Sequence, residues 1–139
     1  MFTEADIDRI GRSVETRTLP KCEWTHAAHF AAAMWVLTHP NLVAERDMPA
    51  VIRGYNDATG TRNTDTTGYH ETITQASIRV ARAFLANRPD AGRAEALSKL
   101  LASPFGRSDW LFVYYSRDRL FSVEARRGWV EPDLSPLPF

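Results

Sequence analysis

The 139-residue sequence predicts an all-α fold: a compact, single-domain helical bundle of about five to six helices, followed by an extended, proline-rich C-terminal tail. Two observations support this prediction. Apolar residues recur at helical spacing along most of the chain, and glycines or prolines stand where most of these periodic segments end. The run that most favours a strand, Trp110 to Tyr115, is equally typical of a short buried helix. We therefore expect one domain over residues 1–139, which is an ordinary domain size.

Local signals define the first three helices. Residues 3–15 place Ile7, Ile10 and Val14 on one stripe. The second helix runs from about residue 22 to 38 and ends before Pro40, because a proline disfavours helical geometry for the residue that precedes it. The third helix begins at about residue 41 or 48 and reaches residue 58, and Pro49 fits a first helical turn. A loop over residues 59–68 follows, without a large apolar side chain.

The second half of the chain continues the helical pattern. A fourth helix is expected over about residues 69–87, stopped by Arg88 and Pro89, and a fifth over residues 90–103, ended by Pro104. A short helical piece carries residues 110–115, and Ser122 fits the N-cap of a last turn. Three prolines predict that residues 130–139 are extended. We expect the tail to pack along the bundle through its apolar side chains, which are Val130, Leu134, Leu137 and Phe139.

The composition excludes several classes of protein. The 17 basic and 17 acidic side chains cancel, whereas a dedicated nucleic-acid binder needs a concentrated basic face, so we expect no nucleic-acid partner. No stretch approaches the ~20 apolar residues of a membrane span, and no secretory signal is visible, so we expect no membrane partner. Cys22 is the single cysteine, which excludes an internal disulfide and favours a cytoplasmic protein. Nothing in the sequence indicates a nucleotide cofactor.

Three of the four histidines are predicted to face the interior. In the apolar segment W-T-H-A-A-H (residues 24–29), His26 and His29 are three positions apart. At ~100° per helical residue they share a stripe with Phe30 and Leu37. The opposite face is apolar as well, so we expect this helix at the centre of the bundle and both rings substantially buried. His70, in G-Y-H-E-T (residues 68–72), points inward from the fourth helix in the same projection.

These three histidines favour a metal site. Rings at i and i+3 reach a common point, and metal sites in bundle cores take ligands from facing helices. His26, His29 and His70 would hold a divalent ion, zinc or another first-row metal, with water in the open position. Glu71 would act as general base or orient a ligand, and Glu23 would be a further ligand or its partner. The hypothesis is a metal-dependent enzyme of unknown reaction.

Two other hypotheses remain open. The second is a metal-free module that binds a small molecule, because long polar loops in compact domains are often binding loops. The stretch that ends in G-Y-H-E-T supplies Asn56, Arg62, Asn63 and Tyr69, of which Arg62 suits a carboxylate or phosphate, and Trp24 would form an apolar wall. The third is a structural or partner-binding helical protein in which every histidine nitrogen is paired within the core.

Three blocks of the sequence carry a resemblance. W-T-H-A-A-H, Y-N-D-A-T-G-T-R-N-T-D-T-T-G-Y-H-E-T and the closing Y-S-R-D-R-L-F-S-V-E-A-R-R-G-W-V-E-P-D-L-S-P-L-P resemble a family of short, uncharacterised bacterial proteins, from about residue 19 onward. The resemblance implies a bacterial, cytoplasmic source. In general arrangement, though not in spacing, three histidines in a small helical bundle are also similar to the metal site of the DinB/YfiT-like helical metal proteins.

Overall fold

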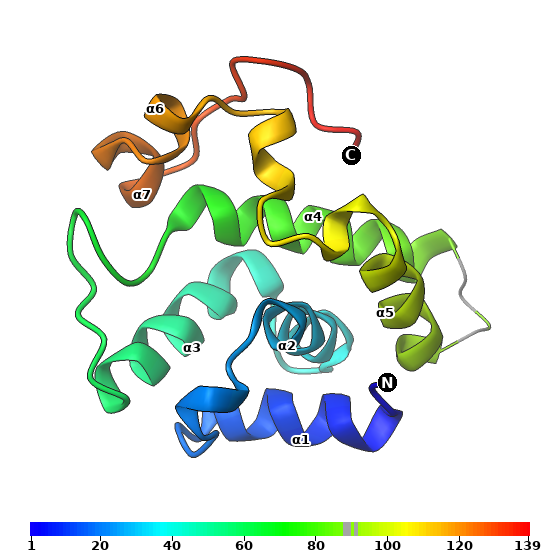
Figure 1. Cartoon of the computed structure of the whole chain (residues 1–139). Helices are drawn as coiled ribbons and strands as arrows, with labels where there is room; N and C mark the ends of the chain where they lie inside the picture. Colours follow the sequence, from blue (N-terminus) through cyan, green and yellow to red (C-terminus); the bar gives the residue numbers. More distant parts are fainter. Residues whose placement is uncertain (88–89, 91) are drawn as a thin grey trace.

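The computed structural model describes residues 1–87, 90 and 92–139, and within them every regular element is helical (Figure 1). The all-α prediction is confirmed. Five helices of 11 to 17 residues form the body of the fold: α1 (Glu4–Glu15), α2 (His26–Thr38), α3 (Ala44–Ala58), α4 (Glu71–Asn87) and α5 (Gly92–Ala102). The remaining described elements are short: α6 (Arg117–Leu120), α7 (Val123–Arg127) and the 3₁₀ turns η1 (Lys21–Glu23), η2 (Pro104–Gly106) and η3 (Trp110–Val113).

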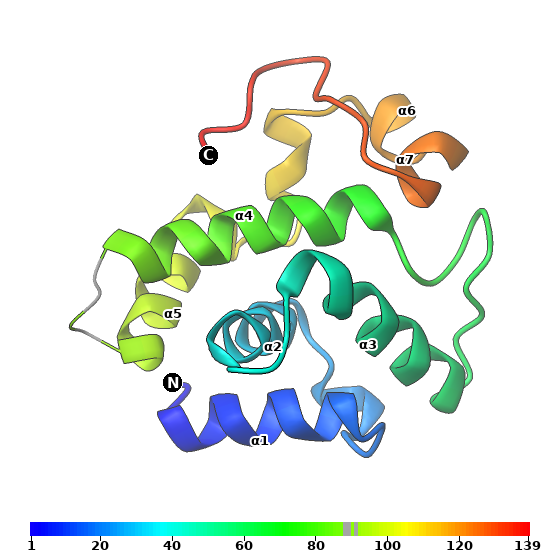
Figure 2. The same cartoon turned by 180° about the vertical axis from the view of Figure 1, so that it is seen from behind.

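Helix α2 is the centre of the bundle, as its sequence predicts. It contacts α1, α3, α4 and α5, and Figures 1 and 2 show it nearly end-on among them. Every residue from Phe30 to Val36 is buried. On α1, Gly11 leaves the space that the ring of Trp35 fills, since a Cβ there would lie 2.1 Å from Trp35 Cγ. A helix that is apolar all round is stable only when it is covered on every side, which fixes the places of its four neighbours.

The helix boundaries follow side-chain caps. Helix α2 begins four residues later than predicted, because the hydroxyl of Thr25 accepts a hydrogen bond from the backbone N–H of Ala28 (3.2 Å) and starts the helix there. Helix α1 begins with the reciprocal bonds of Thr3 and Asp6, and α7 begins at the predicted cap, Ser122. The predicted stop of the fourth helix at residues 88–89 lies outside the described residues.

Pro49 lies inside α3 and not in its first turn, which corrects the sequence prediction. A proline has no N–H, so the carbonyl of Glu45, four residues earlier, loses its partner within the helix. The side chain of Gln75 on α4 takes that place, and its Nε2 donates to the Glu45 carbonyl at 3.2 Å. A contact with a neighbouring helix therefore satisfies the backbone group that Pro49 leaves free.

Residues 110–139 form what we call the C-terminal layer, which covers the face of α4 turned away from α3 (Figures 1 and 2). Its tail, residues 129–139, forms no helix and bends at residues 133–135, and it is held by bonds such as that from the N–H of Leu134 to the carbonyl of Tyr114 (2.9 Å). Val130 and Leu137 pack against the core. The side chain of Leu134 is 59% exposed, so its predicted packing is wrong. Residues 110–113 form a 3₁₀ turn.

No helix in the described part of the chain has the length and apolar character needed to cross a lipid bilayer.

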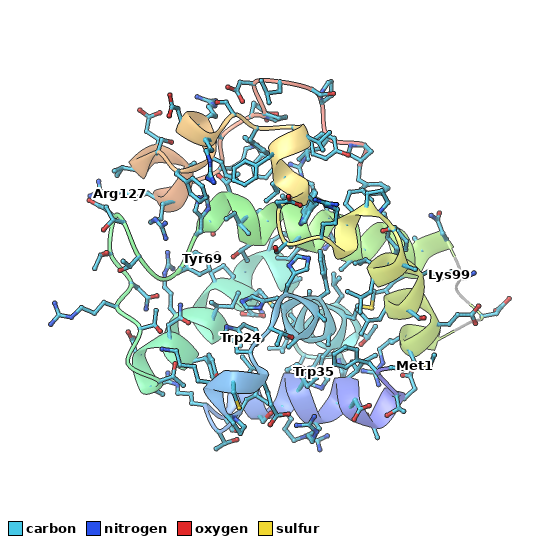
Figure 3. All side chains as sticks on the ribbon, in the orientation of Figure 1. Met1, Trp24, Trp35, Tyr69, Lys99 and Arg127 are labelled. Carbon is cyan, nitrogen blue, oxygen red and sulfur yellow. The ribbon has the colours of Figure 1, made fainter. Side chains whose placement is uncertain are left out.

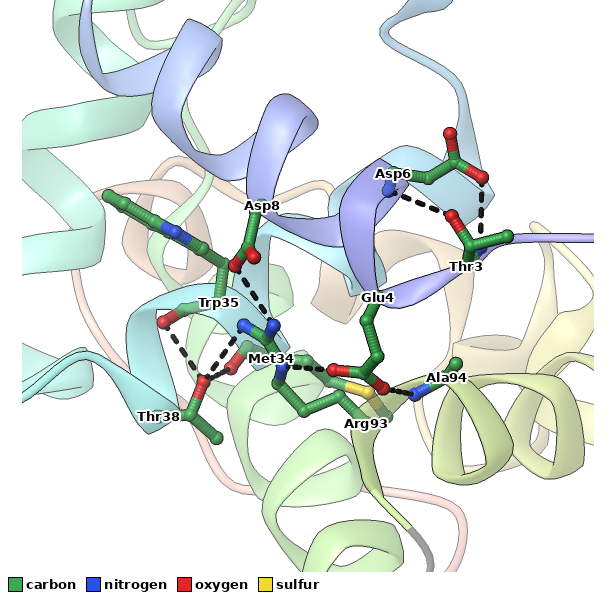
Figure 4. A network of polar contacts seen from close by, with 9 residues as sticks. All are labelled: Thr3, Glu4, Asp6, Asp8, Met34, Trp35, Thr38, Arg93 and Ala94. Carbon is green, nitrogen blue, oxygen red and sulfur yellow. Dashed lines mark hydrogen bonds and ion pairs between the residues drawn. The ribbon is translucent and has the colours of Figure 1, made fainter.

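Arg93 joins its own helix, α5, to α1 and α2 (Figure 4). Its guanidinium contacts Glu4 (2.8 Å) and Asp8 (2.9 Å) of α1 and donates to the hydroxyl of Thr38 of α2 (3.4 Å). The second carboxylate oxygen of Glu4 accepts from the N–H of Ala94 in the first turn of α5 (2.5 Å). The Arg93 side chain is 19% exposed, so these bonds are partly screened from water.

We expect Arg93→Ala to lower the free energy of unfolding by about 1–2 kcal/mol, because charge-assisted bonds in a partly buried place contribute more than exposed ion pairs. Arg46→Ala is the matched control. Arg46 pairs with its neighbour Asp47 and is 66% exposed, so its loss should change stability by at most about 0.5 kcal/mol. Urea unfolding of both variants tests this, and equal losses would contradict the role given to Arg93.

Candidate functional site

The first turns of α2 carry two histidines with similar bonding. The Nε2 of His26 is 3.0 Å from the carbonyl oxygen of Phe105, and the Nδ1 of His29 is 2.7 Å from that of Thr25. A carbonyl only accepts, so each of these nitrogens carries the proton. In the uncharged rings, Nδ1 of His26 and Nε2 of His29 are then acceptors, and neither has a hydrogen-bond partner among the described residues. Both residues are partly buried, where the sequence predicts substantially buried rings.

His29 is held as an uncharged ring. Its imidazole stacks on the indole of Trp24, with 3.6 Å between the ring centroids, and Figure 3 shows Trp24 beside α2 and α3. Burial lowers the pKa of His29 to about 4, although its bond to the Thr25 carbonyl acts in the opposite direction. At neutral pH the Nε2 of His29 is therefore a hydrogen-bond acceptor with low proton affinity.

His26 and His29 line a cavity of about 310 Å³ between α2, α4 and the chain from Ser108 to Phe121; we call it the apolar cavity. Its walls are mainly apolar, and its polar side chains are few. The apolar lining comprises Phe30, Ile73, Trp110, Leu111, Phe112, Leu120 and Phe121, and the polar lining comprises the two histidines, Ser77, Ser108 and Asp109.

A second cavity, of about 390 Å³, lies beside the loop that precedes α4, and we call it the loop-side cavity. It shares His29 and Ile73 with the apolar cavity. Four predicted site residues line it together with His29: Trp24, Asn56, Tyr69 and His70. The structure thus brings His26 and His29 to one cavity and His29 and His70 to the other, and neither cavity is lined by all three histidines.

His70 acts as the N-cap of α4, which begins at Glu71 and not at Tyr69 as predicted. Its Nδ1 accepts from the N–H of Ile73 (3.1 Å), and its Nε2 donates to the carbonyl of Leu120 in α6 (2.6 Å). Both ring nitrogens are therefore used by the fold. Burial lowers the pKa of His70, and the nearby Arg126 acts in the same direction.

Residues 1–87, 90 and 92–139 contain no group of three or more His, Cys, Asp and Glu side chains placed to hold a metal ion. Glu23, the predicted additional ligand, pairs instead with Arg9 of α1 (3.0 Å). The metal site of His26, His29 and His70 stays a prediction.

Glu71 lies in a different place from the histidine cavities. One of its carboxylate oxygens accepts from the hydroxyl of Tyr69 (2.5 Å) and the other from Nε2 of Gln75 (3.4 Å). It lines a charged groove with Gln75, Arg79 and Trp129. Burial, together with the bond to Glu71, raises the pKa of the Tyr69 hydroxyl. The structure therefore gives the Glu71 carboxylate a bonded position away from the His70 ring.

Asn63 organises the loop before α4. Its Oδ1 accepts from Asn56 and from the N–H of Tyr69, both at 3.0 Å. Its Nδ2 donates to the carbonyl of Arg53 (3.2 Å) and to Asp57 (3.0 Å). A side-chain amide can donate two hydrogen bonds and accept two, so the hydrogen-bonding capacity of Asn63 is filled within the fold.

Arg62 is exposed and lines neither cavity. Its carbonyl lies so close to Gly68 that a Cβ at Gly68 would be 2.3 Å away, and Gly68 has a φ of +76°. Glycine is therefore required at the turn that leads into α4. Of the loop that the sequence predicts as a binding loop, Thr61 and Gly68 line the loop-side cavity, whereas Arg62 and Asn63 do not.

The sequence did not identify the residues that cover the apolar cavity, Asp109 to Phe121. The sequence predicts only a short helical piece over residues 110–115. The available signal was the density of aromatic residues, with Trp110, Phe112 and Phe121 close together in the sequence. Nothing local placed them beside α2, about 80 residues earlier in the chain.

Comparisons with family models, curated proteins and solved structures gave no match to this chain.

We expect His70→Ala to lower the free energy of unfolding by about 1–3 kcal/mol, because it removes both the cap of α4 and the bond to α6. His70→Asn keeps a cap acceptor for the N–H of Ile73 but is too short to reach Leu120. It should therefore recover part of the stability. Amide exchange in residues 117–127 should be faster than in the wild type in both variants, because neither keeps the bond to Leu120. Urea unfolding and hydrogen exchange test this. An unchanged stability in His70→Ala would show that His70 is not part of the scaffold.

The low pKa of His29 predicts a loss of stability in mild acid. Its folded-state value of about 4 lies below the ordinary 6.5, so between these values the unfolded chain binds more protons than the native one. Stability therefore falls as the pH drops from about 6.5 towards 4. The contribution of His29 is at most about 3.5 kcal/mol, at about 1.4 kcal/mol per pKa unit.

The difference in unfolding free energy between the wild type and His29→Phe, measured at several pH values, isolates this contribution because His70 is present in both proteins. We expect the variant to lose less stability than the wild type over this range. Parallel profiles would mean that His29 titrates normally.

Proposed function

We propose that the chain is a small-molecule-binding domain whose ligand occupies the apolar cavity and donates a hydrogen bond to Nε2 of His29. The observation that carries this proposal is an imidazole nitrogen without a partner among the described residues, in a ring that lines a mainly apolar cavity. The low pKa of His29 keeps this ring uncharged at neutral pH. Ligand sites in proteins combine such walls with a few placed polar groups.

The size and lining of the apolar cavity support a small aromatic ligand. Its volume of about 310 Å³ lies at the lower end of the range for ligand pockets, about 300–1,000 Å³. Trp110 and Phe112 present aromatic surfaces, with which a flat ring packs in offset or edge-on geometry. The hydroxyl of Ser77 donates its proton to the carbonyl of Ile73 (2.7 Å), so it can offer a ligand only an acceptor, as His29 does.

The pKa of His29 favours binding over base catalysis. A general base works best when its pKa is near the working pH, whereas His29, at about 4, has little affinity for a proton at neutral pH. It accepts a hydrogen bond without taking the proton. An N–H or O–H group on the ligand is the complement of such an atom.

A metal-dependent enzyme is the second candidate function. Two imidazole nitrogens without a partner among the described residues, Nδ1 of His26 and Nε2 of His29, belong to rings that line the same cavity. Uncharged imidazole is also the form that binds zinc and other first-row metals. Elemental analysis of protein purified without a histidine tag tests this candidate, and a metal at near-stoichiometric level would favour it over the first.

The cellular setting is part of the proposal. The side chain of Cys22 is a free, exposed thiol, which suits a reducing compartment. Together with the resemblance of the three sequence blocks to bacterial proteins, it supports a bacterial cytoplasmic protein.

Indole and 1-methylindole test the proposal, because they differ in one N–H group. We expect indole to bind about threefold to tenfold more tightly, as a single hydrogen bond contributes about 0.5–1.5 kcal/mol. Titrations followed by amide NMR should shift signals of residues that line the apolar cavity. Long-range ¹H–¹⁵N correlation spectra of the imidazole rings should show a change in the chemical shift of Nε2 of His29 when indole binds.

Two variants complete this test. His29→Phe keeps an aromatic ring beside Trp24 but removes the acceptor, so it should bind the two compounds equally. Thr61→Ala alters the loop-side cavity alone and should leave both affinities unchanged. If neither compound binds, or if the shifts cluster away from the apolar cavity, the proposed function is wrong.

A further inference from the structure

Two aromatic side chains form the rim of the apolar cavity. Phe112 and Phe121 both line it, and their ring centroids are 5.7 Å apart. Phe121 is 50% exposed although it also faces the cavity. This pair therefore lies where the cavity meets solvent.

Arg117 lies over both rings of this rim. Its guanidinium carbon is 4.9 Å from the centroid of Phe112 and 5.7 Å from that of Phe121, within the range of cation–π contacts. The Arg117 side chain makes no hydrogen bond or ion pair with any residue that the structure describes. A guanidinium that covers a ring keeps its N–H groups free at its edge, where a carboxylate is bound by two parallel bonds.

The other charged groups near the rim are neutralised or directed elsewhere. Asp109, which lines the cavity, is paired with Arg107 through two contacts of 3.1 and 3.3 Å, and this pairing lowers the pKa of Asp109. Arg119 donates to the carbonyl of Glu131 (3.0 Å). Asp118 is exposed and is not part of the cavity lining. Arg117 is therefore the cation at the rim that is left available for an anion.

We propose that the ligand of the apolar cavity is an amphipathic organic acid, an aromatic or branched apolar body inside the cavity with a carboxylate bound by Arg117 at the rim. This inference rests on the proposed function, because it assigns the charged end of the same ligand. The cavity accepts the apolar body, His29 accepts a hydrogen bond from it, and Arg117 distinguishes an acid from its neutral analogue.

Indole-3-acetate and its neutral counterpart, indole-3-ethanol, test this assignment by calorimetric or NMR titration. We expect the acid to bind about threefold to fivefold more tightly than the alcohol, because an exposed ion pair contributes up to about 1 kcal/mol. The preference should shrink in 0.5 M salt, which screens exposed charges.

Variants of Arg117 separate charge from packing. Arg117→Met keeps an apolar side chain over the two phenylalanines and should bring the affinities for the acid and the alcohol within twofold of each other. Arg117→Lys keeps the charge and should retain part of the preference. Arg12→Met, on the exposed face of α1, is the control and should bind both compounds like the wild type.

The alcohol keeps the two proposals distinguishable. If it binds in the apolar cavity but the wild type shows no preference for the acid, the role of Arg117 is wrong while the proposed function stands. The same conclusion follows if Arg117→Met keeps the full preference. If neither compound binds, both proposals are wrong.

Discussion

The fold depends on side chains at the start of α4 that bind backbone atoms of the C-terminal layer. His70 donates to the carbonyl of Leu120, and the hydroxyl of Thr72 lies between the carbonyl of Gly128 (2.9 Å) and the N–H of Val130 (3.2 Å). From the opposite direction, Arg126 donates to the carbonyls of Gly68 (3.0 Å) and Tyr69 (3.3 Å). These bonds fix the position of the layer along α4. They thereby place Leu120 and Phe121 over α2 and close the apolar cavity.

The histidines that appear alike in the sequence have different roles in the structure. Both ring nitrogens of His70 form hydrogen bonds with backbone groups, so neither is left for a ligand. His26 and His29 each use one nitrogen in this way and retain the other. The distinction follows from position. His70 precedes its helix and caps it, whereas His26 and His29 lie within the first turns of α2, where one nitrogen suffices to hold the ring to a nearby carbonyl.

The sequence predicted those features that depend on local interactions. The end of α2 before Pro40, the cap at Ser122 and the central place of α2 all follow from neighbouring residues and periodicity. His70 is buried, as predicted, but its role as the cap of α4 was not predictable in this way, because a helical projection does not apply to a residue outside the helix. The segment that covers the apolar cavity, Asp109 to Phe121, and the helical position of Pro49 depend on contacts between distant parts of the chain. The periodicity of the sequence does not predict such contacts.

The bond between His29 and Thr25 also bears on the conformational entropy that the His29 side chain would lose on binding a ligand. Thr25 caps α2 with its hydroxyl, while its carbonyl holds Nδ1 of His29, and Trp24 covers one face of the ring. The first turn of the helix thus fixes both the tautomer and the rotamer of His29 before any ligand arrives. Immobilising a free side chain on association costs about 0.5–1.5 kcal/mol. At His29 this ordering takes place during folding, so a ligand of the proposed kind would meet an acceptor that is already oriented.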